Sequence, residues 1–158
     1  MEMHNLEKNN SEKISVGVDI GGTAVKIGLF YENGKIITKT EIPTRQDDNC
    51  AYVLSDTADT VKKLIKETEV DINNIVGIGI GVPGPVADGI VKHCVNLHWE
   101  NSVDVSGIME RLTGLKAVTV NDANAAAVGE LWMGGGKERG SMILVTIGTG
   151  IGGGIVIK

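Results

Sequence analysis

A short turn near the start of the chain has the composition of a phosphate-binding turn. In the run DIGGT, Gly21 and Gly22 allow the backbone angles at which successive N–H groups point at one anion. Thr23 adds a hydroxyl donor, and Lys26 can reach a phosphate, although a lysine in solvent is an equal alternative. Asp19 can hold Mg²⁺ directly or through water, because this ion keeps several waters and takes few carboxylates. These residues predict a site for a phosphate and its metal ion.

A second turn of the same kind lies 127 residues further along. The run VTIGTG at residues 145–150 repeats the pattern of VDIGGT at residues 18–23, in which an apolar strand enters a Gly/Thr turn. Two such turns facing each other can hold a triphosphate from both sides. The nucleotide-binding candidates of this second turn are Gly148, Thr149, Gly150, Gly152, Gly153 and Gly154. A glycine-rich hairpin without a ligand is the alternative.

Two matches to G-x-G-x-x-G do not predict a dinucleotide site. That fingerprint requires a helix directly after the turn. Prolines follow the match that begins at Gly79, and the apolar residues 155–157 indicate a strand after the match that begins at Gly148. The sequence also lacks G-x-x-x-x-G-K-[ST], which excludes a P-loop.

Asn121 and Asp122 stand between an apolar run and an alanine-rich stretch, where a strand passes into a helix. Both residue types are favoured as helix N-caps. Asp122 can also serve as the general base for a hydroxyl nucleophile, with the helix N-terminus keeping its carboxylate ionised. A weak base is sufficient because phosphoryl transfer needs mainly positioning of the nucleophile. Capping and catalysis are compatible, so both interpretations stay open.

The run NLHWEN, which begins at Asn96, mixes polar groups with an aromatic ring and can line a polyol site. His93, Cys94 and His98 lie close to it in the sequence. With no further ligand nearby, these three residues do not predict a metal site.

Hydrophobic periodicity predicts the elements that position these residues. We expect strands at 14–20, 24–30, 35–42, 75–82 and 117–120, and helices from Asp48 or Asn49 to about 69, at 103–112 and at 123–133. A further strand pair, 142–147 and 154–157, surrounds a turn at 148–153. The order βββαβαβα followed by a hairpin indicates an α/β domain with a mixed sheet, and differs from the strict βαβ alternation of doubly wound nucleotide folds. Glycines at 77, 79 and 81 leave one strand face bare, so another element can pack close to it.

Composition narrows the partners and the compartment. The 158 residues carry a net charge of −5, Lys and Arg are scattered, and aromatic residues make up only 3%, so no nucleic-acid partner is expected. Cys50 and Cys94 lie far apart and are expected to be reduced thiols. The polar residues 1–13 form no signal peptide and are expected to be a disordered tail. The uncharged segment 140–157 contains six glycines and suits two strands better than a membrane span, so no membrane partner and a cytoplasmic location are expected.

Five motifs in this order resemble those of the repressor/open-reading-frame/kinase (ROK) family, most closely its bacterial glucokinases. They are DIGGT at 19–23, GVPGP at 81–85, NLHW at 96–99, NDANAA at 121–126 and GTGIGGG at 148–154. Together they are far more specific than any one of them, and the resemblance extends over residues 14–158.

The resemblance implies an actin-like (ribonuclease H-like) ATPase fold of two domains, with ATP and sugar between them. It implies transfer of the γ-phosphoryl group of ATP to the 6-hydroxyl of a hexose, with Mg²⁺. Carried over by position, Asp122 resembles the catalytic base and Asn121 a sugar ligand, with Gly84 and Asn96 as weaker sugar-side candidates. Glucose is the expected substrate. Fructose, N-acetylmannosamine, N-acetylglucosamine, a β-glucoside, or a sugar-responsive regulator remain alternatives.

The chain departs from the family in length, since members are about twice as long. We expect residues 14–136 to form the first domain and 137–158 to begin a truncated second one. The structural zinc site, further sugar ligands and the adenosine pocket are expected only in the missing half, so this chain alone is expected to be inactive. The unpaired strands of the last hairpin favour self-association, and a homo-oligomer, a dimer, is expected. The acidic charge and the lack of a helix-turn-helix segment weigh against a regulator.

Overall fold

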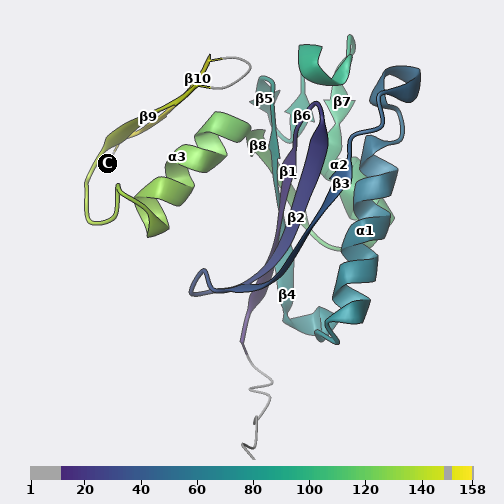
Figure 1. Cartoon of the computed structure of the whole chain (residues 1–158), viewed down its shortest axis with the longest axis horizontal. Coiled ribbons are helices and arrows are strands. Elements are labelled where there is room, and N and C mark those ends of the chain that lie inside the picture. Colours follow the sequence, from purple (N-terminus) through teal and green to yellow (C-terminus); the bar gives the residue numbers. More distant parts are fainter. Residues whose placement is uncertain (1–11, 148–150, 158) are drawn as a thin grey trace, which may run out of the picture.

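The structure, a computed structural model, describes residues 12–147 and 151–157 of the chain. Its centre is a five-stranded sheet in the order β3-β2-β1-β4-β8 (Figure 1). The first three strands are antiparallel, whereas β4 and β8 run parallel to β1, which confirms the mixed sheet. The bounds are β1 Ile14–Ile20, β2 Ala24–Tyr31, β3 Ile36–Pro43, β4 Ile75–Val82 and β8 Ala117–Asn121.

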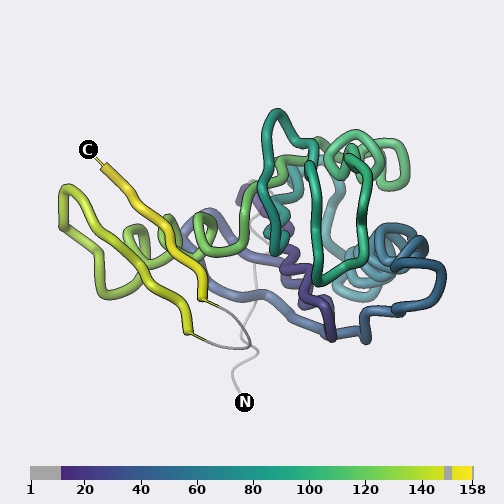
Figure 2. The backbone as a smooth tube through the Cα atoms, turned by 90° about the horizontal axis from the view of Figure 1, so that it is seen from above, coloured from purple at the N-terminus to yellow at the C-terminus, as the bar shows by residue number. Residues whose placement is uncertain are grey.

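Helices cover the two faces of this sheet unequally (Figure 1). The helices α1 (Val53–Glu67) and α2 (Val105–Thr113) pack together on one face. On the other side lies α3 (Asp122–Met133), which contacts the hairpin of β9 (Met142–Ile147) and β10 (Ile151–Val156). Seen from above, the hairpin runs alongside α3 and apart from the main sheet (Figure 2).

The hydrophobic core lies between the sheet and the face of α1 and α2. Along β1, β2 and β4 the apolar side chains that point to this face are buried, and Ile20, Val25 and Val82 are fully so. The predicted apolar stripe of α1 covers them, from Leu54 to Ile65. On the opposite face the sheet carries Asp19 and glycines, and Val118 is 65% exposed there. This less covered face, on the side of α3, is the one that carries the polar groups.

A small three-stranded sheet stands beyond the carboxyl end of β4, where no strand was predicted and residues 103–104 were expected to begin a helix. It consists of β5 (Val86–Ala87), β6 (Ile90–Val91) and β7 (Val103–Asp104), with the 3₁₀ turn η3 (Val95–Leu97) between β6 and β7. Strands of two residues are too short to show a hydrophobic period, which is why the predicted βββαβαβα order omits them.

Three predicted boundaries are wrong. Helix α1 begins at Val53 because Asp48, Asn49 and Cys50 have positive φ angles, and the preceding residues form the 3₁₀ turn η1 (Asp47–Cys50). Helix α2 begins later than predicted, capped by the Asp104 carboxylate, which accepts from the Gly107 N–H. Strand β10 begins at Ile151, so the turn before it is shorter than predicted.

A further 3₁₀ turn, η2 (Ile72–Asn74), precedes β4. Within the described residues, no helix is long and apolar enough to cross a membrane.

Candidate active site

Strand register places Asp19 and Asp122 at the same edge of the sheet. Asp19 in β1 pairs with Gly81 in β4, and Gly81 pairs with Val120 in β8, two residues before Asp122. Parallel strands bring their carboxyl ends to one edge, where α/β proteins bind their ligands. Neighbouring strands are about 4.8 Å apart, so only the width of β4 separates the two acidic strand ends.

The two aspartates line one cavity of about 610 Å³ between the sheet and α3. Its floor is bare because Gly79 and Gly81 have no side chains. A Cβ on Gly81 would stand 3.6 Å from Asp122 Cα and 3.8 Å from Ala125 Cβ, so a larger side chain there would fill the space. Near Gly79 the closest atom, Val16 O, would be 4.0 Å away, so α3 packs close to the bare face only at Gly81. The predicted close approach of another element is therefore confirmed at Gly81, and also at Gly77, where a Cβ would stand 2.9 Å from Lys116 O.

A second cavity, of about 990 Å³, adjoins the first one. All four sugar-side candidates line it, together with Asp88, Thr119, Gly152 and Gly153. These four are Gly84, Asn96, Asn121 and Asp122. Asp122 and Thr146 line both cavities and so mark where they meet. The structure thus brings together residues from four separate parts of the sequence.

The side chain of Asn121 fixes the start of α3. Its Oδ1 accepts from the N–H groups of Ala123 (3.1 Å) and Asn124 (3.2 Å), so Asn121 is the N-cap and Asp122 the first helical residue. Its Nδ2 donates to Gly84 O (3.2 Å) and to Asp122 Oδ1 (3.0 Å). The capping interpretation therefore applies to Asn121.

Asp122 is half-buried, and its two carboxylate oxygens differ. Oδ1 accepts from Asn121 Nδ2 and from the Ala123 N–H at 2.8 Å. Oδ2 has no hydrogen-bond partner within residues 12–147 and 151–157. One oxygen is held in place while the other can accept a hydrogen bond from a ligand hydroxyl, which is the arrangement that a positioned general base needs.

Partial desolvation by the cavity walls raises the pKa of Asp19 above its ordinary value. The nearby Lys26 ammonium lowers this pKa, and the carboxylate of Asp122 raises it. Lys26 and Asp19 also line a separate hollow over β2 and β3. A cation beside Asp19 would favour its ionised form, so the site suits Mg²⁺ on electrostatic grounds. A single carboxylate is an ordinary protein contribution to Mg²⁺ binding, since phosphates and water fill the remaining positions.

The first glycine turn is held from behind by the segment that follows β3. Thr44 Oγ1 donates to Gly21 O (2.7 Å), Gln46 Nε2 donates to Gly22 O (2.9 Å), and the Thr44 N–H donates to Thr23 O (2.9 Å). Gly21, Gly22 and Thr23 are absent from the lining of the two cavities at Asp122, but Asp19, just before them, lines the smaller one.

The second glycine turn is only partly within the described residues. The candidates Gly148, Thr149 and Gly150 lie outside them. Gly152, Gly153 and Gly154 belong to strand β10, which corrects the expected turn at 148–153. Gly152 and Gly153 line the larger cavity, whereas Gly154 is buried against α3. A Cβ on Gly154 would stand 2.5 Å from Ala123 O, so packing alone requires glycine there.

Three cavity residues were missed from the sequence. Thr146 could have been predicted, because the internal repeat aligns VTIGTG with VDIGGT and Thr146 is the residue that aligns with Asp19. Thr119 is buried, and its hydroxyl lies 2.8 Å from that of Ser106. Asp88 belongs to the turn between β5 and β6, two strands that the sequence did not predict.

The described residues contain no group of three His, Cys, Asp or Glu side chains that could hold a metal ion. Cys94 is buried, with its thiol 3.2 Å from Pro83 O, and burial raises the pKa of that thiol. Its role is to pack the loop that carries Asn96.

Comparisons with known proteins agree on one family. The ROK family model matches residues 15–158. A glucokinase from Halalkalibacterium halodurans is 38% identical over 148 residues, which cover 92% of this chain and 44% of that protein. A xylose repressor from Caldicellulosiruptor bescii is 30% identical over 154 residues, which cover 96% of this chain and 38% of the repressor.

A crystal structure of a ROK family glucokinase from Streptomyces griseus, in complex with glucose and AMPPNP, matches with a TM-score of 0.75 and 32% identity. The match covers 91% of this chain and 44% of that one. It confirms the expected fold class, an actin-like (ribonuclease H-like) α/β fold with a mixed sheet. The chain spans less than half the length of the relatives named above.

Proposed function

This chain belongs to the ROK family, and from that premise we propose that it contributes the phosphate-binding and sugar-binding residues of an ATP-dependent sugar kinase, a glucokinase. One observation carries the proposal. Asp19 and Asp122 line the same cavity, and beyond Asp122 this cavity meets a second one lined by Gly84, Asn96 and Asn121. A nucleotide at the first aspartate and a sugar at the amide groups would meet at Asp122.

Each residue has a role in the proposed transfer. Asp122 Oδ2 accepts the proton of the sugar 6-hydroxyl as the hydroxyl oxygen bonds to the γ-phosphorus and the bond from that phosphorus to the β–γ bridging oxygen breaks. Asn121 holds Oδ1 of that carboxylate and ties the helix start to the Gly84 carbonyl. Asp19 would hold Mg²⁺, directly or through water. When bound, Mg·ATP would supply the γ-phosphoryl group, and its magnesium ion would neutralise the charge that develops on the departing ADP.

The bare glycine floor supports this use of the smaller cavity. Side chains at positions 79 and 81 would occupy the space between Asp19 and Asp122, where phosphate groups must pass. The first turn, Gly21 to Thr23, and the glycines of the second turn are proposed to bind the phosphates. The division into domains 14–136 and 137–158, the homodimer and the cytoplasmic location likewise remain proposals.

The proposal is tested with the full-length gene product, Mg²⁺ and ATP, on glucose, fructose, N-acetylmannosamine, N-acetylglucosamine and a β-glucoside. ADP release gives kcat/KM for each sugar, and NMR locates the phosphate on the product. Glucose should give the highest kcat/KM and carry phosphate on its 6-hydroxyl. If the protein phosphorylates none of these sugars, the proposal is overturned.

The variant Asp122→Asn isolates the proposed base. It should lower kcat by about 10²–10⁴-fold, the usual contribution of a general base, while circular dichroism stays that of the parent. Asp59→Asn makes the same chemical change on the exposed face of α1, beside Lys62, and should leave kcat unchanged. A rate for Asp122→Asn within tenfold of the parent would remove Asp122 from its role.

A further inference from the structure

We propose that Thr44 and Gln46, braced by Arg45 between them, are positioning residues for the nucleotide. They turn the peptide groups of the first glycine turn so that the N–H groups of Gly22 and Thr23 are presented to phosphate oxygens. The inference rests on the proposed function, because it concerns the turn assigned there to the phosphates.

Two side-chain donors reach two successive carbonyls of the turn. The Thr44 hydroxyl donates to Gly21 O at 2.7 Å, and the Gln46 side-chain amide donates to Gly22 O at 2.9 Å. Thr44 is buried, with 7% of its surface exposed, whereas Gln46 is exposed. Each bond fixes the direction of one peptide carbonyl.

A planar trans peptide places its N–H opposite its C=O. No peptide bond in the described part of the chain is cis. With Gly21 O and Gly22 O turned toward residues 44–46, the N–H groups of Gly22 and Thr23 therefore point to the other side of the turn. Neither N–H donates a hydrogen bond to any described residue. Two adjacent unpaired N–H groups with a common direction form an anion-binding nest.

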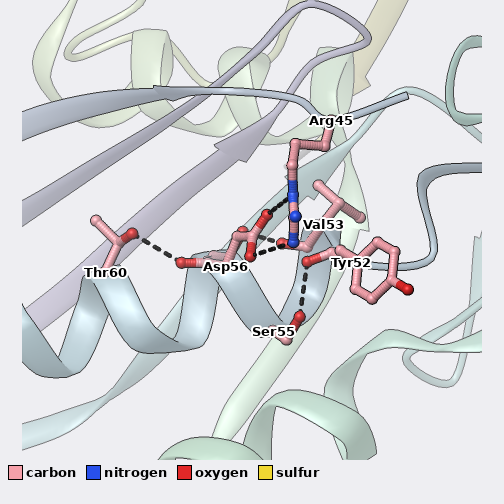
Figure 3. Close-up of polar contacts among 7 residues, drawn as sticks. Arg45, Tyr52, Val53, Ser55, Asp56 and Thr60 are labelled. Carbon is pink, nitrogen blue, oxygen red and sulfur yellow. Dashed lines mark hydrogen bonds and ion pairs between the residues drawn. The ribbon is translucent and has the colours of Figure 1, made fainter. Parts of the chain in front are cut away.

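Arg45 ties this donor segment to helix α1 (Figure 3). Its Nε donates to Asp56 Oδ2 at 2.7 Å and its Nη2 to Asp56 Oδ1 at 2.9 Å, so the pair is bidentate. The guanidinium also lies over the Tyr52 ring, 4.6 Å from its centre. The fork geometry restricts the arginine more than a single contact would, so the pair adds a restraint on residues 44–46 behind the turn.

Thr44 and Gln46 also lie apart from the cavity proposed to bind the sugar. Among the described residues, the hydrogen bonds of Thr44 and Gln46 go to the turn, and neither residue lines a cavity at Asp122. Loss of their bonds should therefore weaken nucleotide binding and leave the affinity for sugar unchanged. A purely structural role would lower stability without this selectivity.

Calorimetry on the full-length gene product measures the Kd of a non-hydrolysable ATP analogue with Mg²⁺, without sugar, and steady-state kinetics gives KM for ATP and for sugar. Thr44→Val should raise the Kd about fivefold, the size expected for one hydrogen bond, and raise KM for ATP while KM for sugar stays constant. Thr44→Ser, which keeps the hydroxyl, should restore parental binding. Gln46→Met, on an exposed residue, provides a second variant should Thr44→Val fail to fold.

Thr60→Val is the matched control. Thr60 Oγ1 also donates to a backbone carbonyl at 2.7 Å, that of Asp56 within α1, and the same bond is drawn in Figure 3. Equal Kd values for Thr44→Val, Gln46→Met and Thr60→Val would overturn the inference. If the parent binds the analogue but phosphorylates no sugar, the proposed function fails while the Kd comparison still decides this inference. A parent that binds no nucleotide overturns both.

Discussion

Gly22 lies against the backbone of Asn96, so that a Cβ at position 22 would stand 2.9 Å from Asn96 O and 3.4 Å from Asn96 Cβ. The first residue belongs to the proposed phosphate turn and the second to the loop that lines the larger cavity. The two proposed substrates are thus served by segments in direct contact. A side chain added at position 22 would therefore displace one of these two segments.

This contact makes Gly22→Ala a test of coupling between the two segments. A Cβ at 2.9 Å from a backbone oxygen forces the turn or the loop to shift, so KM should rise for both ATP and sugar, each about tenfold. Steady-state kinetics with each substrate varied in turn measures this. Gly129→Ala in α3 is the control, because its Cβ would meet nothing within 4 Å. A rise in KM for ATP alone would mean that the two segments act independently.

The raised pKa of Asp19 predicts a trade of stability for function. Because the folded state holds the Asp19 proton more tightly than the unfolded state does, folding stability falls as pH rises from the ordinary carboxyl pKa to the raised one. Asp19→Asn removes this penalty and should therefore raise the Tm of the ligand-free protein at pH 7, and the difference should vanish under acidic conditions.

The same variant should lose function, because an amide is a poor ligand for Mg²⁺. We expect kcat/KM for Mg·ATP to fall about 10²-fold. Thermal melts from pH 3 to pH 8 and steady-state kinetics provide the two measurements. Asp59→Asn serves again as the control for removal of an exposed carboxylate. A lower Tm for Asp19→Asn at pH 7 would show that the ionised carboxylate stabilises the fold.

Long apolar patterns and strand-end motifs were the parts of this structure that the sequence made predictable. The five strands of the main sheet follow from alternation and turn residues, and the strand-to-helix passage at Asn121 from residue type. Because Asp19 lies one residue before the end of β1 and Asn121 ends β8 in the same sheet, their common edge follows as well. The convergence of Asn96 on the same site does not, because its loop is placed by strands of two residues each.

The remaining errors have local physical causes. Helix α1 starts late because three successive residues from Asp48 have left-handed backbone angles. The spacing of apolar residues gives no information on such angles. Gly154 was placed in a turn because a run of glycines suggests one, whereas it belongs to β10, and its contact with Ala123 gives a packing reason for glycine there. Glycine composition indicates a close approach of the backbone without saying to what.

Two substitutions of Asn121 distinguish its capping of helix α3 from its positioning of the Asp122 carboxylate. Asn121→Ala removes the acceptor for two helix N–H groups and should cost about 1 kcal/mol of unfolding free energy. Asn121→Asp keeps the acceptor but loses both donations, to Gly84 O and to Asp122 Oδ1, and adds a second carboxylate beside Asp122. It should lose less stability than Asn121→Ala, yet lower kcat and move the acidic limb of the pH–rate profile upward.

Urea unfolding and pH–rate profiles of the two Asn121 variants make the measurement. A pH profile of Asn121→Asp that superposes on the parent would contradict the prediction, because it would mean that the added carboxylate does not affect the ionisation of Asp122.

Neighbouring glycines in β10 distinguish packing from ligand approach. A Cβ on Gly154 would stand 2.5 Å from Ala123 O and 2.6 Å from Ala127 Cβ, whereas one on Gly153 would meet only Leu144 O, at 3.7 Å. Gly154→Ala must push the hairpin away from α3 and should cost about 1–3 kcal/mol, the usual effect of overpacking. Gly153→Ala should stay within about 0.5 kcal/mol of the parent in urea unfolding. Gly153 lines the larger cavity, whereas Gly154 does not. If Gly153 is required for the approach of a ligand, Gly153→Ala should weaken nucleotide binding while stability stays unchanged. Equal losses of stability in both variants would contradict the packing role of Gly154.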